Sequence, residues 1–210
     1  MRWCHITTSA LAAAVVGLSA SYACAQEFTA HLSGNNEIGS IPTTVTVTTL
    51  GSPSPTSYTG AVLSDGRGEV KLDLDQKTQT VTYTLTYSNV GTTPPKTGTV
   101  LFAHIHFGKS RDSGGVLVFF CNNVTPFTGT GPTPPPCPTN SGTVSGTWTA
   151  MDVQAIAGQN VVVGDFDALV NALTSNTAYA NVHQTVYPGG EIRGQVHLAK
   201  EEKEQHDHGN

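Results

Sequence analysis

Polar and apolar residues alternate along two neighbouring stretches, and this pattern constrains the fold more than any other feature of the chain. Residues 67–74 (RGEVKLDL) and residues 80–87 (TVTYTLTY) carry apolar side chains at every second position. Successive side chains of a β-strand point to opposite faces, so each stretch predicts a strand with one buried and one solvent-exposed face. Residues 75–78 (DQKT) provide a turn between them. The sequence therefore predicts an antiparallel hairpin.

Shorter segments of the same kind continue along the chain. Strands are predicted at residues 28–32, 43–49, 100–107, 116–120, 143–149, 179–184 and 191–198. The run 116–120 (VLVFF) is apolar throughout, which is typical of a central strand. One short helix is predicted near residues 165–174, because apolar residues recur there at helical spacing behind Asp165 as the N-cap. These elements predict an all-β fold, an antiparallel, Greek-key-like sandwich or partly closed barrel of about eight strands.

The two ends of the chain differ from the middle. Residues 1–25 combine a basic start, an apolar run and an A-x-A motif ending at Ala25, which predicts a cleaved signal peptide. This apolar run is too short to span a membrane, and no other such run occurs, so no transmembrane segment is predicted. Residues 200–210 are charged and lack apolar side chains, so we expect a disordered tail. One β domain, residues 26–199, remains between them, and we expect it to be secreted or periplasmic.

Export also determines how the cysteines are interpreted. The chain has four, of which Cys4 and Cys24 belong to the predicted signal peptide. Cys121 and Cys137 remain, and an even pair in an exported chain predicts a disulfide bond. This bond would close a segment rich in Pro, Gly and Thr and stabilise the fold by roughly 3 kcal/mol in chain-entropy models.

Residues 100–107 (VLFAHIHF) contain the side chains best suited to a binding site. On a strand, His104 and His106 point to the same face and lie about 7 Å apart. Two imidazoles at this spacing could hold one metal ion or clamp an anionic ligand. They could equally lie on a solvated surface.

Polar residues also take alternate positions on the last two predicted strands. They are His183 and His197, together with Asn181, Glu191, Arg193 and Gln195. In one hypothesis, His104, His106 and His183 form a copper or zinc site, since imidazole suits both metals. In the other, hydrogen bonds hold the histidines, and the last four of the listed residues form a structural polar cluster.

Arg193 allows two interpretations within this pattern. Its guanidinium fork could anchor an anionic ligand. We instead expect an internal ion pair with Glu191, Asp152 or Asp165, of which Glu191 would lock the last hairpin. The register of that hairpin also decides whether His183 shares the face of Arg193, because a slip of one residue reverses every side chain.

Several of these segments resemble the CHRD domain family. The similarity lies in residues 32–34 (LSG) with Glu37, 103–108 (AHIHFG), the helix from Asp165, 180–183 (ANVH) and 188–196 (PGGEIRGQV). The family is named for chordin, an extracellular antagonist of growth factors of the bone morphogenetic type, and the domain also occurs alone in secreted bacterial proteins. The resemblance covers nearly all of residues 28–198 and is to this single-domain bacterial type. It implies an extracellular β domain but no particular biochemical activity.

Composition and motifs narrow the possible functions. The net charge is −5 and no basic run is present, which argues against a nucleic-acid partner. No nucleophile elbow, metalloprotease helix, phosphate loop or dinucleotide fingerprint occurs, so we do not expect an enzyme. We expect a secreted, non-enzymatic CHRD-domain protein that acts as a binding or interaction module for a protein or a small ligand. The alternative is a periplasmic or extracellular protein that binds copper or zinc through the His-x-His strand.

Overall fold

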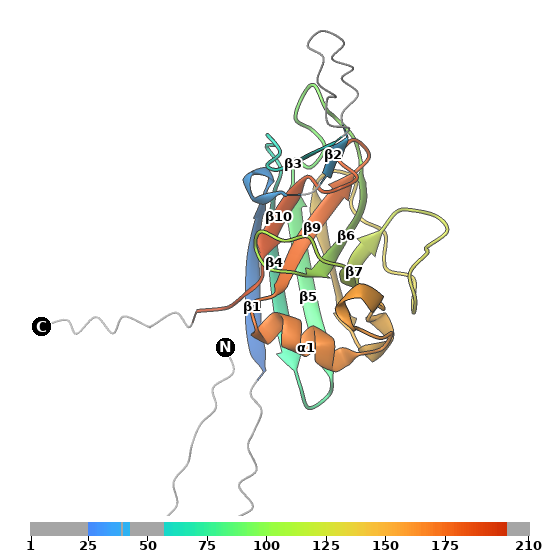
Figure 1. Ribbon diagram of the computed structural model, residues 1–210. Helices are drawn as coiled ribbons and strands as arrows, with labels where there is room; N and C mark the ends of the chain where they lie inside the picture. The colour runs from blue at the N-terminus through green and yellow to red at the C-terminus, as the bar shows by residue number, and fades with distance from the viewer. Residues whose placement is uncertain (1–24, 39, 43–56, 201–210) are drawn as a thin grey trace, which may run out of the picture.

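The computed structural model describes residues 25–38, 40–42 and 57–200 (Figure 1). Its elements are, in chain order, β1 (Gln26–Ser33), η1 (Gly34–Asn36), β2 (Ser40–Pro42), β3 (Ser57–Thr59), β4 (Arg67–Asp75), β5 (Thr80–Ser88), β6 (Val100–Phe107), β7 (Val116–Asn122), β8 (Gly142–Trp148), η2 (Ala150–Asp152), η3 (Ala157–Gln159), α1 (Phe166–Thr174), β9 (Ala178–Gln184), β10 (Ile192–Gln195) and β11 (His197–Leu198). The predicted signal peptide, strand 43–49 and charged tail lie outside the described residues, apart from Ala25 and Lys200.

The long strands form one antiparallel sheet that nearly closes as a barrel (Figure 1). Neighbours follow the order β7-β6-β9-β10-β1-β4-β5-β8, while β11 also pairs with β1, and β2 pairs with β3 separately. The two ends of this order meet, because Trp148 Nε1 in β8 donates a 2.8 Å hydrogen bond to the Phe119 carbonyl in β7. The predicted all-β, partly closed barrel with one short helix is therefore confirmed.

Apolar side chains fill the interior of the barrel. In the β4–β5 hairpin, Val70 lies opposite Leu85, and both side chains are buried. Directly opposed residues of antiparallel strands share a face, so the alternation of both strands places one apolar face inside. On the other wall, Ala103 and Ile105 of β6 enter the same core. The outward face of β5 remains in contact with solvent, as Thr82 illustrates.

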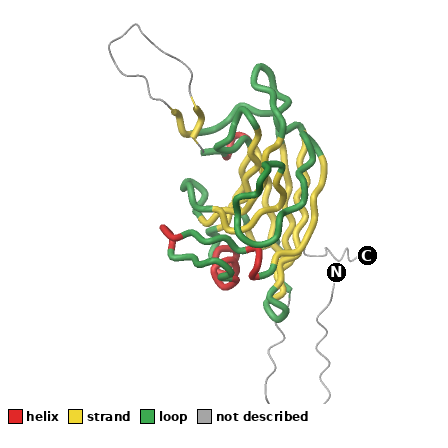
Figure 2. The backbone as a smooth tube through the Cα atoms, turned by 90° about the vertical axis from the view of Figure 1, so that its right-hand side faces the viewer, coloured by secondary structure: helices red, strands yellow, loops and turns green. Residues whose placement is uncertain are grey.

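Helix α1 covers part of this core. It lies near the lower ends of the strands in Figure 1, and Figure 2 shows it outside the sheet at the same level. Asp165 Oδ1 accepts a 3.0 Å hydrogen bond from the Ala168 amide, which confirms the predicted N-cap. Leu169 and Leu173 are buried against the core. Neither this helix nor any other among the described residues has the length and apolar character needed to cross a membrane.

Strand β7 corrects one prediction. Its apolar sequence predicted a central strand, but β7 stands at one end of the strand order. Both of its faces are apolar because Phe120 is buried in the barrel core, while Phe119 packs outside against Phe127 from the following segment. That segment is tied back by the disulfide bond between Cys121 and Cys137, which the structure contains as predicted.

Candidate metal centre

Strands β6 and β9 lie side by side, and their register brings the histidines onto one face. Phe102 pairs with His183, and His104 pairs with Asn181. Since opposed residues share a face and alternate residues on one strand do too, His106 lies on this face as well. Ile105, between the two β6 histidines, points into the barrel core instead. The histidines therefore occupy the outer face of the barrel wall.

The last hairpin has the register that sequence reasoning left open. Arg193 of β10 pairs with Asn181 of β9. Asn181 and His183 are alternate residues on one strand, so Arg193 and His183 share a face. The outer face thus extends across three adjacent strands.

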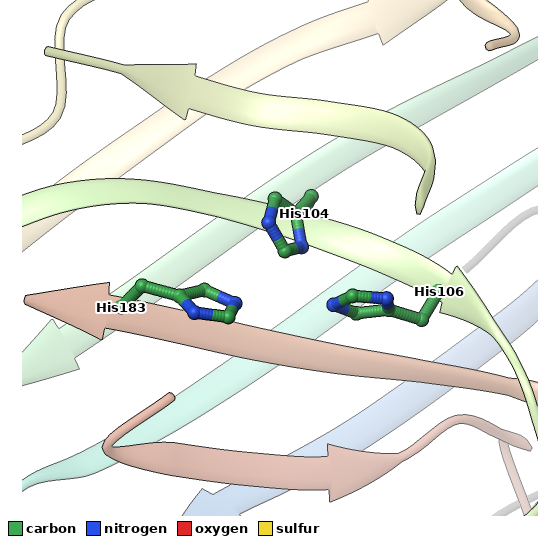
Figure 3. Close-up of side chains that lie close together, drawn as sticks. All are labelled: His104, His106 and His183. Carbon is green, nitrogen blue, oxygen red and sulfur yellow. The ribbon is translucent and has the colours of Figure 1, made fainter. Parts of the chain in front are cut away.

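The three imidazoles point toward one another (Figure 3). The ring centroid of His104 lies 4.4 Å from the ring centroid of His106 and 4.4 Å from that of His183. The centroids of His106 and His183 are 6.0 Å apart. One nitrogen from each ring can be chosen so that all three lie within 4.8 Å of one another. Three such points lie within about 2.8 Å of a common centre, compared with about 2.0 Å for a metal–imidazole bond. A shift of less than about 1 Å per ring would complete a coordination shell.

Backbone carbonyls orient two of these rings. His106 Nδ1 lies 2.8 Å from the Gly114 carbonyl, and His183 Nδ1 lies 2.9 Å from the Pro188 carbonyl. A carbonyl only accepts, so each Nδ1 must carry the proton, and each Nε2 is left with a free lone pair. This is the arrangement that metal-binding histidines usually adopt, since the second hydrogen bond fixes the tautomer and the ring orientation.

Each ring also has one buried nitrogen that finds no hydrogen-bond partner among the described residues. These atoms are Nδ1 of His104 and Nε2 of both His106 and His183. The side chains of His104, His106 and His183 are 3%, 9% and 5% exposed, so bulk water does not satisfy them. An unpaired buried polar atom costs about 1–3 kcal/mol. Three of them in one place are costly unless a ligand uses them.

Burial keeps the cluster in its neutral form. Desolvation, together with the neighbouring His183 and His106, lowers the pKa of His104 well below its usual value. Desolvation and then the His106 charge lower the pKa of His183 to about 3, although its bond to Pro188 opposes the shift. Desolvation also lowers the pKa of His106 to about 4, and the Arg193 charge adds to this effect. Neutral imidazole is the form that binds metal.

Aromatic rings surround the three histidines. Phe102 stacks on His104 at 5.2 Å and lies 4.8 Å from His183. Phe119 meets His104 edge-on at 5.2 Å, and Tyr179 stacks on His106 at 4.6 Å. These rings and the loops that carry Gly114 and Pro188 shield the outer face. The interpretation of the histidines as a solvated surface is therefore wrong for this structure.

The CHRD domain family matches the chain over residues 28–196. The chain belongs to the CHRD family. No curated protein matches it. CHRD domains are typically extracellular interaction modules, and a disulfide bond between Cys121 and Cys137 fits such a setting.

Arg193 of this CHRD domain does not form the expected ion pair. Its Nη2 donates 2.8 Å hydrogen bonds to the carbonyls of Lys109 and Asp112, and its guanidinium carbon lies 3.4 Å from the centre of the Tyr179 ring. The side chain is 2% exposed. Arg193 thus fixes the β6–β7 loop onto the outer face. The predicted ion pair does not form, because two backbone carbonyls and an aromatic ring lie nearer to the guanidinium group than the carboxylates of Glu191, Asp152 and Asp165.

The other members of the predicted polar cluster have separate roles. Glu191 accepts hydrogen bonds from Ser64 Oγ at 2.6 Å and from the Gly91 amide at 2.9 Å, so it joins loops rather than pairing with Arg193. Gln195 Nε2 donates to the Asn176 carbonyl at 2.9 Å. Asn181 Nδ2 reaches Glu37 Oε1 at 3.5 Å. Glu37 also interacts electrostatically with Arg193, so Asn181 and Arg193 share one partner on this face.

Sequence reasoning missed the role of Tyr179. Its hydroxyl accepts a 3.1 Å hydrogen bond from the Gly114 amide, while its ring contacts both His106 and Arg193. Tyr179 precedes Asn181 and His183 at the same two-residue spacing, so the alternation of β9 already placed it on their face. No comparable pattern in the sequence indicates that the β6–β7 loop covers this face.

Proposed function

We propose that this protein is a secreted, non-enzymatic CHRD-domain binding module that holds one copper or zinc ion at His104, His106 and His183. Family membership supports the module, and the geometry of the imidazoles alone supports the ion. The observation that carries the proposal is the convergence of three buried, neutral ring nitrogens that have no hydrogen-bond partner among the described residues.

Hydrogen bonding alone explains the cluster less well. A structural histidine would use both ring nitrogens, whereas His106 and His183 use only Nδ1 in the described structure. Their free Nε2 atoms face a third imidazole that, being neutral, can donate through only one nitrogen. An ion satisfies all three lone pairs at once.

The division of the chain belongs to the same proposal. Residues 1–25 act as a signal peptide, residues 26–199 form the CHRD domain, and residues 200–210 form a charged tail. Export supplies the oxidising setting in which the bond between Cys121 and Cys137 is stable.

A metal titration tests the proposal. The exported chain is freed of metal with a chelator and titrated with Cu(II) and Zn(II) by calorimetry, in a His206→Ala/His208→Ala background that removes the tail histidines. We expect one ion per chain and a loss of affinity on the order of 100-fold or more in His104→Ala/His106→Ala. Binding weaker than about millimolar, or binding that survives this double substitution, contradicts the proposal.

The chain offers a matched control. His31 and His197 are exposed and lie outside the cluster, so His31→Ala/His197→Ala removes the same number of imidazoles. We expect this variant to bind metal like the parent chain.

The second candidate is an interaction module that binds a protein partner without metal. Membership of the CHRD family favours it. A folded chain that binds no ion would leave this candidate in place.

A further inference from the structure

The charge balance of the candidate centre restricts which ion it can hold. Among the described residues, the group that could bind a metal consists of three histidines and includes no carboxylate or thiolate. A neutral ligand set leaves the full charge of the ion uncompensated. Arg193 lies nearby, against the Tyr179 ring that stacks on His106, but the buried carboxylate of Glu37 interacts with Arg193 and offsets its charge.

Burial makes the uncompensated charge expensive. The cost of moving an ion from water into a region of low dielectric constant rises with the square of its charge, so a divalent ion costs about four times as much as a monovalent ion of similar size. His104 and His183 are only 3% and 5% exposed, and phenylalanine rings flank both. The site therefore favours a monovalent ion.

The number of ligands points the same way. Zinc sites are almost always tetrahedral, and those with three protein ligands complete the shell with water. Here Phe102 and Phe119 both pack against the His104 ring, and neither ring can hydrogen-bond to a metal-bound water. Cuprous ion, Cu(I), is monovalent and forms stable complexes with two or three nitrogen ligands.

We propose that the three-histidine centre is selective for Cu(I) over Zn(II) and Cu(II). This inference rests on the proposed metal-binding function and adds the identity and oxidation state of the ion. The selectivity comes from the neutral ligand set and the aromatic surroundings.

Competition experiments test the selectivity on the exported chain. Cu(I) is supplied anaerobically as its bicinchoninate complex, and transfer to the protein is followed by the loss of the colour of that complex. Zn(II) and Cu(II) affinities are measured by calorimetry in the same buffer without Cu(I). We expect one Cu(I) per chain, bound on the order of 100-fold or more tighter than Zn(II).

A charge substitution tests the physical cause. Phe102 lies on the same strand face as His104 and His183 and is only partly buried, so Phe102→Glu places a carboxylate beside the ion. We expect Zn(II) binding to strengthen relative to Cu(I) by about 10-fold or more. Phe102→Gln is the matched control, since it has the same shape without the charge and should keep the preference of the parent chain.

The outcomes separate the two proposals. Zn(II) or Cu(II) bound at these histidines as tightly as Cu(I) overturns the selectivity and leaves the proposed function intact. No binding of any of the three ions overturns both. If the parent chain prefers Cu(I) but folded Phe102→Glu and Phe102→Gln show the same ratio, the charge argument is wrong. The affinity ratio of the parent chain decides the selectivity even if neither variant folds.

Discussion

The β4–β5 hairpin and the β6–β9 pair are built from the same kind of alternating strand, yet their polar faces have different fates. On the hairpin, polar residues such as Thr82 and Lys71 remain exposed. On the β6–β9 pair, every residue of β9 is buried, including Asn181 and His183. The hairpin face meets water, whereas loops and aromatic rings cover the other face. A polar strand face is therefore an ordinary solvent-exposed surface when no other segment covers it. It becomes a candidate site when loops or aromatic rings cover it.

The largest expected effect is a dependence of stability on pH, which the histidines of the covered β6–β9 face cause. The pKa values of His106 and His183 are lowered to about 4 and about 3, below the ordinary value of 6.5 that applies to the unfolded chain. Below pH 6.5 the unfolded state therefore binds more protons, and the stability of the metal-free protein falls as pH decreases toward the folded-state pKa values. Each histidine contributes up to about 1.4 kcal/mol per pH unit, which amounts to several kcal/mol in total.

Denaturant unfolding of the metal-free chain between pH 7 and pH 5 measures this effect, in a range where most carboxylates do not titrate. His31→Ala/His197→Ala is the matched control, since both side chains are exposed and lie outside the covered face of β6 and β9. A flat stability profile between pH 6.5 and pH 5 would contradict the burial of neutral imidazoles.

A smaller effect tests whether the inward faces are equivalent. Leu85 on the hairpin and Ile105 between the two β6 histidines are both fully buried in the same core. Leu85→Ala and Ile105→Ala should each lower the free energy of unfolding by about 2–5 kcal/mol, because both leave a cavity. Chemical denaturation with unchanged slope measures the loss. A cost near zero at Ile105 would mean that the β6 wall does not pack as the hairpin does.

The smallest effect compares the outward faces directly. His104 has an unpaired buried nitrogen, so His104→Leu should stabilise the metal-free protein by about 1 kcal/mol while abolishing metal binding. Thr84 on the exposed face of β5 shares a hydrogen bond with Ser145, and Thr84→Val should change stability by less than about 0.5 kcal/mol. Thermal unfolding of both variants with and without metal gives the comparison. Destabilisation by His104→Leu would indicate a structural histidine.

Local patterns predicted much of this molecule. The alternation of β4 and β5 identified a hairpin, and Asp165 with the apolar spacing behind it identified α1. The two-residue spacing of His104 and His106 placed both on one face of β6. These features depend only on residues that are close together in the sequence, so the local pattern is enough to predict them.

Long-range packing accounts for the rest. The position of β7 at the end of the strand order depends on β8, about twenty residues further along the chain, and the sequence of β7 alone indicates only that its side chains are buried. The partners of Arg193 are backbone carbonyls at Lys109 and Asp112, which carry no sequence signature. Whether His183 shares a sheet face with Arg193 depends on the register between β9 and β10. The irregular connection between these strands does not allow that register to be predicted from the sequence.

The loop that carries Gly114 has a consequence for the kinetics of ligand exchange. Arg193, Tyr179 and His106 each hold it by a hydrogen bond to its backbone. Because the Gly114 carbonyl also orients the His106 ring, a loosened loop would release that ring, and an ion held there would leave faster and bind more weakly. The rate of exchange and the affinity of the centre thus depend on the same loop.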